Sequence, residues 1–167
     1  VYIKRFWLPA RIEILVQEQE PAITIAPNEK VPPIAFYTKT GKLIGRAYLP
    51  LNPSFKTVKV LTYGTCGNSS KFDKDKIKFI LMIARDIEQA SKEPVQYIDL
   101  RNPNDIYVQI PSVKIKLGSV SIATYPDTLK KINDLPSILP KVKILNKNVK
   151  YIDLRWQNNL YYIKLAD

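Results

Sequence analysis

A five-residue sequence occurs twice in this chain and constrains its fold more than any other feature. Tyr97–Arg101 and Tyr151–Arg155 both read Tyr-Ile-Asp-Leu-Arg, and an asparagine-rich break and a second tyrosine-bearing apolar run follow each copy. A sequence that recurs with the same flanking pattern predicts a repeated structural unit. Two alternating runs separated by turn-forming residues are typical of a β-hairpin. We therefore expect two β-hairpins, Gln96–Ile110 in the middle of the chain and Lys150–Leu165 at its end.

The last hairpin is expected to close with a two-residue turn at Asn158-Asn159, because asparagine tolerates the left-handed backbone region. This turn predicts two sets of facing residues. On the apolar face it pairs Trp156 with Tyr161, Leu154 with Ile163 and Ile152 with Leu165; on the polar face it pairs Arg155 with Tyr162 and Asp153 with Lys164. Apolar and charged pairs then lie on opposite faces, and such a separation specifies a register.

The middle hairpin needs a different turn, because a two-residue turn would place Asp99 opposite Val108. A three-residue loop, Asn102–Asn104, instead pairs Ile98 with Val108 and Leu100 with Ile106. The two copies are therefore predicted to be similar in shape but different in detail.

The polar face of the last hairpin has two interpretations. Its residues are Tyr151, Asp153, Arg155, Tyr162 and Lys164. A mixed aromatic and charged face on a terminal strand suits a partner that adds its own strand to the sheet. The alternative is a solvated face with a cross-strand ion pair of little energetic weight.

Two helices are expected elsewhere in the chain. Ser70–Ala90 has apolar residues at helical spacing, and Ser70 followed by Asp73 fits a capping box. A short helix begins near Pro126 and stops near Pro136, and the lysines from Lys141 to Lys150 are expected in a loop. Together these elements predict an α+β fold: a mixed, mostly antiparallel sheet of hairpins with one long and one short helix packed on it.

The N-terminal segment is predicted to form two strands of its own. Val1–Gln19 alternates in polarity and is broken at Leu8-Pro9-Ala10. Ile12, Ile14 and Val16 share one face, the pattern of a half-buried strand. A domain boundary is expected near Glu20–Pro21.

The net charge of +11 permits nucleic acid, anionic lipid or an acidic protein as a partner. Asp73–Glu93 contains equal numbers of acidic and basic residues, so the excess lies on both flanks. A basic nucleic-acid-binding β-domain would gather aromatic residues with lysine and arginine on one sheet face. The ten tyrosines are dispersed along the chain, and no RNA-binding motif is present. Nucleic acid is therefore the alternative hypothesis, not the leading one.

Catalysis is not expected. The chain has no histidine, which excludes Ser-His-Asp and Cys-His mechanisms, and one cysteine, Cys66, which excludes an internal disulfide and a multi-cysteine zinc site. Asp99, Asp153 and Cys66 have no partner motif. We expect no cofactor and no metal.

The C-terminal motif resembles the end of the extracytoplasmic β-domain of the FtsQ/DivIB family of bacterial division proteins. Members commonly finish in a strand like Tyr151–Arg155, a tight turn and a last strand, and Leu117-Gly118-Ser119 before a short helix matches a second family feature. The junction between the family's POTRA module and its β-domain is matched by Arg5, Trp7, Pro9, Ile12, Ile14, Val16, Glu18, Pro21 and Ala22. Leu8, Gln19, Thr38 and the length of Ser119–Thr124 depart from the family pattern.

The resemblance implies that residues 1–19 are the end of a POTRA module and that residues 20–167 are the β-domain. It also implies a non-enzymatic scaffold at the division septum, anchored in the cell membrane by a segment outside this chain. The implied partners are FtsB/DivIC-like and FtsL-like proteins and, through them, the septal peptidoglycan synthases; no nucleic acid is expected.

In the family, the FtsB partner adds a strand to the final strand of the β-domain. The motif match and this strand addition place partner contacts at Arg155, Trp156, Asn158, Leu160, Tyr162 and Lys164. The pairing pattern independently favours Arg155, Tyr162 and Lys164, whereas it places Trp156 on the inner face.

Overall fold

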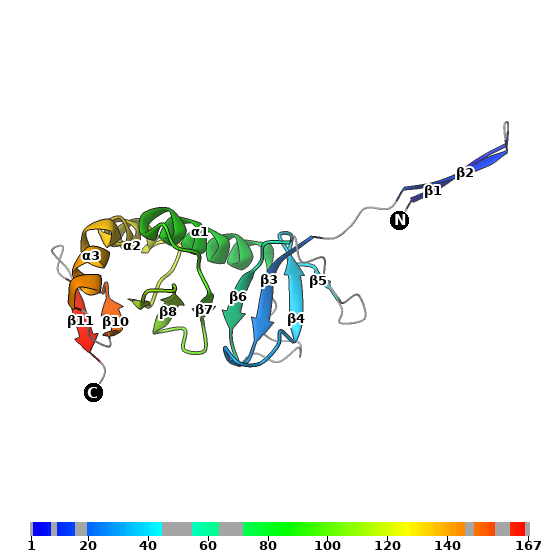
Figure 1. Ribbon diagram of the computed structural model, residues 1–167. Coiled ribbons are helices and arrows are strands. Elements are labelled where there is room, and N and C mark those ends of the chain that lie inside the picture. Colours follow the sequence, from blue (N-terminus) through cyan, green and yellow to red (C-terminus); the bar gives the residue numbers. More distant parts are fainter. Residues whose placement is uncertain are drawn as a thin grey trace.

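The computed structural model places the strands of this chain in two sheets (Figure 1). It describes residues 2–7, 10–15, 20–44, 55–63, 72–145, 149–155 and 161–165. One sheet pairs β1 (Tyr2–Phe6) with β2 (Arg11–Leu15). The other has nine strands, in the order β11 (Tyr162–Leu165), β10 (Val149–Asp153), β9 (Lys114–Gly118), β8 (Ile106–Gln109), β7 (Tyr97–Asp99), β6 (Val58–Leu61), β3 (Pro21–Ala26), β4 (Ala35–Thr38) and β5 (Leu43–Ile44).

The nine-stranded sheet is mixed. The pairs β3/β6, β6/β7 and β9/β10 are parallel, and the other neighbours are antiparallel. Parallel neighbours need a long crossover connection. Helix α1 (Lys74–Ser91) connects β6 to β7, and helices α2 (Tyr125–Ile132) and α3 (Leu135–Leu145) connect β9 to β10. The expected α+β class with a mostly antiparallel sheet is confirmed.

Helix α1 begins later than the sequence indicated. Asp73 is its N-cap, because the Asp73 carboxylate accepts a hydrogen bond from the Lys76 backbone N–H at 2.8 Å. The predicted start at Ser70, which lies outside the described residues, is therefore wrong by one helical turn. The predicted core stripe is confirmed, and its buried members are Ile77, Ile80, Ile83, Ala84 and Ile87.

Helix α3 corrects the expectation of a lysine-rich loop after Pro136. Proline is tolerated in the first helical turn, where its missing N–H has no partner to lose, so Pro136 does not stop the helix. Pro140 lies inside the helix and is exposed. Leu135, Ile138, Leu139 and Val142 are buried at helical spacing, and this burial outweighs the cost of the second proline.

The β1–β2 hairpin stands apart from the nine-stranded sheet in Figure 1. The two predicted strands are confirmed, and Ile3 faces Ile14 across the pair. The half-buried face expected for these strands is not observed, because Ile3, Ile12 and Ile14 are 68%, 65% and 61% exposed. The reason is that no second layer covers this face within the described residues.

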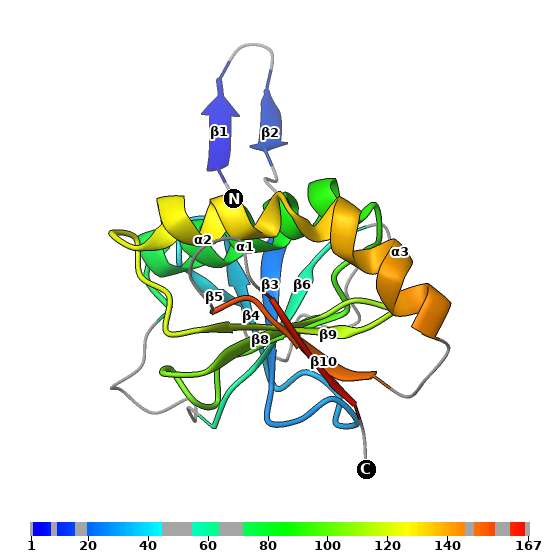
Figure 2. The same ribbon diagram turned by 90° about the vertical axis from the view of Figure 1, so that its left-hand side faces the viewer.

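The main core lies between the sheet and the helices, which all lie on one side of it (Figure 2). Ile98, Val108, Ile115 and Ile152, from four neighbouring strands, are all 0% exposed on this inner face. Because successive strand residues point to opposite faces, their neighbours in sequence form the outer face of the sheet. That outer face includes Tyr97, Asp99, Tyr107, Gln109, Lys114, Lys116, Tyr151, Asp153, Tyr162 and Lys164.

Candidate functional site

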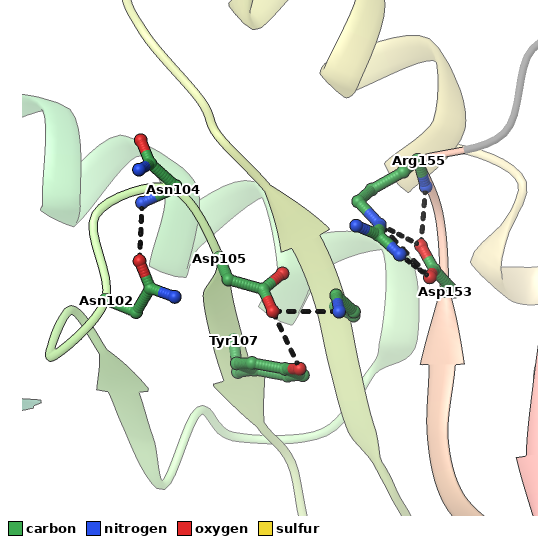
Figure 3. Close-up of polar contacts among 7 residues, drawn as sticks. Asn102, Asn104, Asp105, Tyr107, Asp153 and Arg155 are labelled. Carbon is green, nitrogen blue, oxygen red and sulfur yellow. Dashed lines mark hydrogen bonds and ion pairs between the residues drawn. The ribbon is translucent and has the colours of Figure 1, made fainter.

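The second copy of the repeat ends strand β10 in a clasp between Asp153 and Arg155 (Figure 3). The Asp153 carboxylate accepts hydrogen bonds from the Arg155 backbone N–H at 3.0 Å, from Nε at 2.9 Å and from Nη2 at 2.7 Å. The Leu154 N–H donates to the Lys116 carbonyl at 3.0 Å, and Lys131 Nζ donates to the Arg155 carbonyl at 2.9 Å. The Asp153 carboxylate therefore binds the Arg155 backbone N–H in place of an acceptor on a neighbouring strand, and β10 ends at Asp153.

The first copy makes the same clasp. Asp99 accepts from the Arg101 backbone N–H at 3.1 Å, from Nε at 2.9 Å and from Nη2 at 2.6 Å. The Leu100 N–H donates to the Leu61 carbonyl at 2.8 Å, on the neighbouring parallel strand. The sequence repeat is thus a structural repeat: a strand with a parallel neighbour, closed by an Asp-Leu-Arg turn.

This clasp corrects the register predicted for the last hairpin. Ile152 faces Ile163, Asp153 faces Tyr162 and Tyr151 faces Lys164, so each partner is two residues away from the one expected. A shift of two residues keeps every side chain on its predicted face. The expected pairs of Arg155 with Tyr162 and Asp153 with Lys164 are wrong, because Asp153 binds Arg155 on its own strand instead.

The register predicted for the middle hairpin is confirmed at Ile98 and Val108, which face each other as expected. Its loop is longer than three residues, because β7 ends at Asp99 and β8 begins at Ile106. Leu100 and Ile106 are therefore not a strand pair. The Asp99 clasp accounts for the early end of β7, as the Asp153 clasp accounts for the end of β10.

Of the six predicted contact residues, the structure describes three: Arg155, Tyr162 and Lys164. Trp156, Asn158 and Leu160 lie outside the described residues. Tyr162 and Lys164 lie on the outer face of β11, opposite Asp153 and Tyr151. Arg155 lies just beyond the end of β10 and bends back onto Asp153, so the three described residues gather around one end of the sheet.

Strand β11 is the last strand of the nine-stranded sheet, and β10 is its only strand partner in the described part of the chain. Tyr162 is 53% exposed and Leu165 is 40% exposed, whereas Ile163 packs partly against the core. Lys141 on α3 donates a hydrogen bond to the Tyr161 hydroxyl at 3.1 Å at the start of the strand. Among the residues that the structure describes, the strand is thus paired on one side and unpaired on the other.

The outer face next to this edge gathers tyrosine and lysine, which the sequence reasoning missed. Lys116 Nζ lies 5.3 Å from the ring of Tyr107 and 5.5 Å from the ring of Tyr151, which are themselves 6.0 Å apart. It also forms a 2.8 Å ion pair with Asp105, whose Oδ2 accepts from the Tyr107 hydroxyl at 3.1 Å. Residues that are distant in sequence meet here because their strands are neighbours. The two-residue period of each strand was the sequence signal that these side chains share one face.

The carboxylates of both clasps are ionised in the folded protein. Burial opposes ionisation of Asp153, but hydrogen bonds from the Arg155 side chain and backbone outweigh it and lower the pKa of Asp153. The same balance, with Arg101 as the donor, lowers the pKa of Asp99. Burial, reinforced by Glu29, raises the pKa of Tyr97 to about 12. Near neutral pH, Asp99 and Asp153 are therefore charged and Tyr97 is neutral.

Gly118 makes room for the Arg155 side chain. Its φ is +76°, and a Cβ added there would lie 2.5 Å from Cδ and 2.8 Å from Cγ of Arg155. Gly118→Ala is expected to destabilise the protein by about 1–2 kcal/mol, because the left-handed conformation is unfavourable for alanine and the arginine stem must move. Urea denaturation measures the loss. Ser119→Ala, at the exposed neighbouring position, is the control and should change the stability little.

No metal site or membrane span is found in the described regions. There, no group of three or more His, Cys, Asp or Glu residues is placed to hold a metal ion. No described helix is both long enough and apolar enough to cross a bilayer. A scan against models of protein families and a search of curated proteins return no match to this chain.

Proposed function

We propose that this chain is a non-enzymatic scaffold of the FtsQ/DivIB type that binds a partner by strand addition to β11. The observation that carries the proposal is the position of β11 at the end of the sheet, with β10 as its only strand partner in the described residues. A backbone edge of this kind supplies main-chain hydrogen bonds to an extended peptide. Side chains on both faces of β11 then select the partner.

The opposite edge of the sheet suits strand addition less well. Within the described residues, strand β5 has two residues, Leu43 and Ile44, whereas β11 has four. A short edge strand offers few backbone groups, and short edges are one way in which proteins avoid unwanted pairing. Leu165 and Tyr162 are also exposed on opposite faces of β11, so an added strand would gain side-chain contacts on both faces.

The partners proposed for this edge are FtsB/DivIC-like and FtsL-like division proteins, which would connect the chain to septal peptidoglycan synthases. The proposed location is the extracytoplasmic side of the cell membrane at the division septum, with the anchor outside this chain. The motif resemblance around Tyr151–Arg155 supports these assignments, and the contact residues are proposed to be Arg155, Trp156, Asn158, Leu160, Tyr162 and Lys164.

A nucleic-acid-binding domain is the second candidate, because the outer face gathers tyrosines with lysines. Two features disfavour it. Asp99, Asp105 and Asp153 pair with cations on or beside this face, which reduces its net positive charge. The rings of Tyr107 and Tyr151 also lie against Lys116, which occupies space that a stacked base would need. A gel shift with single-stranded nucleic acid at physiological salt separates the two candidates.

Binding of a peptide from the FtsB/DivIC-like protein of the same organism tests the proposal. Tyr162→Ala should weaken binding about tenfold, because exposed tyrosines commonly anchor interfaces. Lys164→Asp should weaken it if the partner strand is acidic. Fluorescence anisotropy measures both affinities, with Tyr63→Ala as the control, since Tyr63 is a 71% exposed tyrosine near the β7–β8 loop. Unchanged affinity in both β11 variants would contradict the assignment of β11 as the binding surface.

A further inference from the structure

A basic groove lies along helix α1, at the opposite end of the sheet from β11. Its volume is about 340 Å³, and its lining residues are Lys39, Lys74, Lys78, Leu81, Met82 and Arg85. Of these six lining residues, which are the ones that the structure describes, four are cations and none is acidic. The proposed strand-addition site uses none of them.

The helix separates its charges by face. Lys74, Lys78, Leu81 and Arg85 follow one another at spacings of four, three and four residues and so share one stripe. Two of the helix acids lie elsewhere: Asp75 lines a different cavity, and Glu88 binds Lys56 at 2.9 Å. A third, Asp86, is buried. The equal numbers of acids and bases in Asp73–Glu93 therefore conceal a one-sided positive surface.

Arg85 is the one groove cation with an acidic partner in the described structure. Its guanidinium lies 2.9 Å from Asp86, but its side chain is 64% exposed and Asp86 is buried beneath it. Tyr125 also donates a hydrogen bond to Asp86 at 2.6 Å, so this carboxylate is shared between two donors. Arg85 thus keeps an open side from which a second carboxylate can approach.

The turn between β4 and β5 fixes Lys39 on the other side of the groove. Gly41 in this turn has φ +85°, and a Cβ there would lie 3.1 Å from both the backbone nitrogen of Lys74 and the backbone carbonyl oxygen of Phe72. The turn therefore packs closely against the start of α1. Between these walls Leu81 and Met82 are half-buried and pack against the core, so they form an apolar floor.

We propose that this groove binds an acidic peptide segment of a protein partner, with a large apolar side chain placed between carboxylates. The row from Lys74 to Arg85 is roughly 16 Å long at 1.5 Å per residue. An extended peptide spans that length with about five residues at 3.3 Å each. Charge complementarity selects the carboxylates, and the floor of Leu81 and Met82 accepts the apolar side chain.

Met82 is the single methionine of the chain, so its methyl group gives one NMR signal that reports on the groove. The full chain, labelled at the methionine methyl, is titrated with a synthetic peptide of alternating glutamate and leucine. The control peptide has glutamine in place of glutamate. The Met82 signal is expected to move with the acidic peptide and not with its neutral counterpart, and the shift should weaken as salt is raised.

Charge reversal provides the second arm of the test. The double variant Lys74→Glu/Lys78→Glu is expected to bind the acidic peptide at least about tenfold more weakly. Lys76→Glu is the matched control, because Lys76 lies on the same helix but lines the other cavity. Circular dichroism verifies that all of these variants fold, as expected for substitutions on the outer surface of the helix.

Three results would overturn the proposal. The first is a Met82 signal that does not respond to the acidic peptide. The second is a double variant that binds as tightly as the wild type. The third is a response to vesicles containing anionic lipid, or to single-stranded DNA, without a response to the peptide. The groove and β11 share no residue. The groove variants should therefore lose the acidic peptide but bind the FtsB/DivIC-like peptide at β11 as tightly as the wild type does.

Discussion

Replacing Ile98 by alanine is expected to lower the free energy of unfolding by about 2–5 kcal/mol. Ile98 is completely buried on the inner face of β7, a central strand with β6 and β8 on either side. Removal of its side chain leaves a cavity that two flanking strands and the helical layer prevent from closing. Urea denaturation followed by circular dichroism measures the change at an unaltered m-value.

Two further alanine variants calibrate this result. Ile144 on α3 is 81% exposed, so Ile144→Ala should change the stability little. Ile152 is the equivalent of Ile98 in the second copy of the repeat and is also fully buried. Ile152→Ala is expected to cost less than Ile98→Ala, because β10 adjoins the end strand and its surroundings relax more easily. A loss below about 1 kcal/mol for Ile98→Ala would contradict the central position of β7.

Removal of the second clasp is expected to have the next largest effect. Asp153→Ala should destabilise the protein by about 1–3 kcal/mol at pH 7, because it removes hydrogen bonds between a carboxylate that is 3% exposed and its arginine. Asp127→Ala is the control. Asp127 also forms an ion pair, with Lys130, but both side chains of that pair are more than three-quarters exposed. Exposed pairs of that kind contribute little to stability.

The pH dependence of this effect has a definite sign. The pKa of Asp153 in the folded protein lies below its usual value, and an aspartate in the unfolded chain has a pKa of about 3.9. The clasp therefore stabilises the protein in full above the unfolded pKa and less as the pH falls through that value toward the folded pKa. Wild type and Asp153→Ala should differ most near pH 7 and converge in acid. Equal stabilities at pH 7 would contradict the buried clasp.

The alternation of polar and apolar residues predicted most of the sheet, because a two-residue period assigns each side chain to a face whatever the turn. The pairing of Ile98 with Val108 was found in this way, and Tyr162 and Lys164 lie on their predicted face. Alternation could not predict where pairing stops. In both copies an aspartate captures the N–H two residues later, and that local competition ends the strand.

Helix α3 was missed because two prolines and several lysines were interpreted as a stop and a loop. The buried spacing of Leu135, Ile138 and Val142 carried the opposite signal. The outer-face cluster and the α1 groove were missed for a different reason. Counting tyrosines or charges along the chain ignores the geometry that brings Lys116 to Tyr151 and separates the acids of α1 from its bases.

Both copies of the repeat form inner strands of the sheet, and they differ in the strand that follows them. In the first copy the clasp closes β7 between two neighbouring strands, which leaves no free edge there. In the second copy the same clasp closes β10, and the chain continues into β11 at the end of the sheet. The proposed function therefore depends on the strand that the chain forms after Arg155, and not on the repeated residues alone.

Amide hydrogen exchange of β11, measured with and without the FtsB/DivIC-like peptide, tests strand addition most directly. Strand addition predicts that alternate backbone amides within Tyr162–Leu165 become protected when the peptide binds, because only every second N–H of an edge strand points outward. Amides of β5 at the opposite edge should not change. Peptide binding that protects no β11 amide would contradict the proposed function.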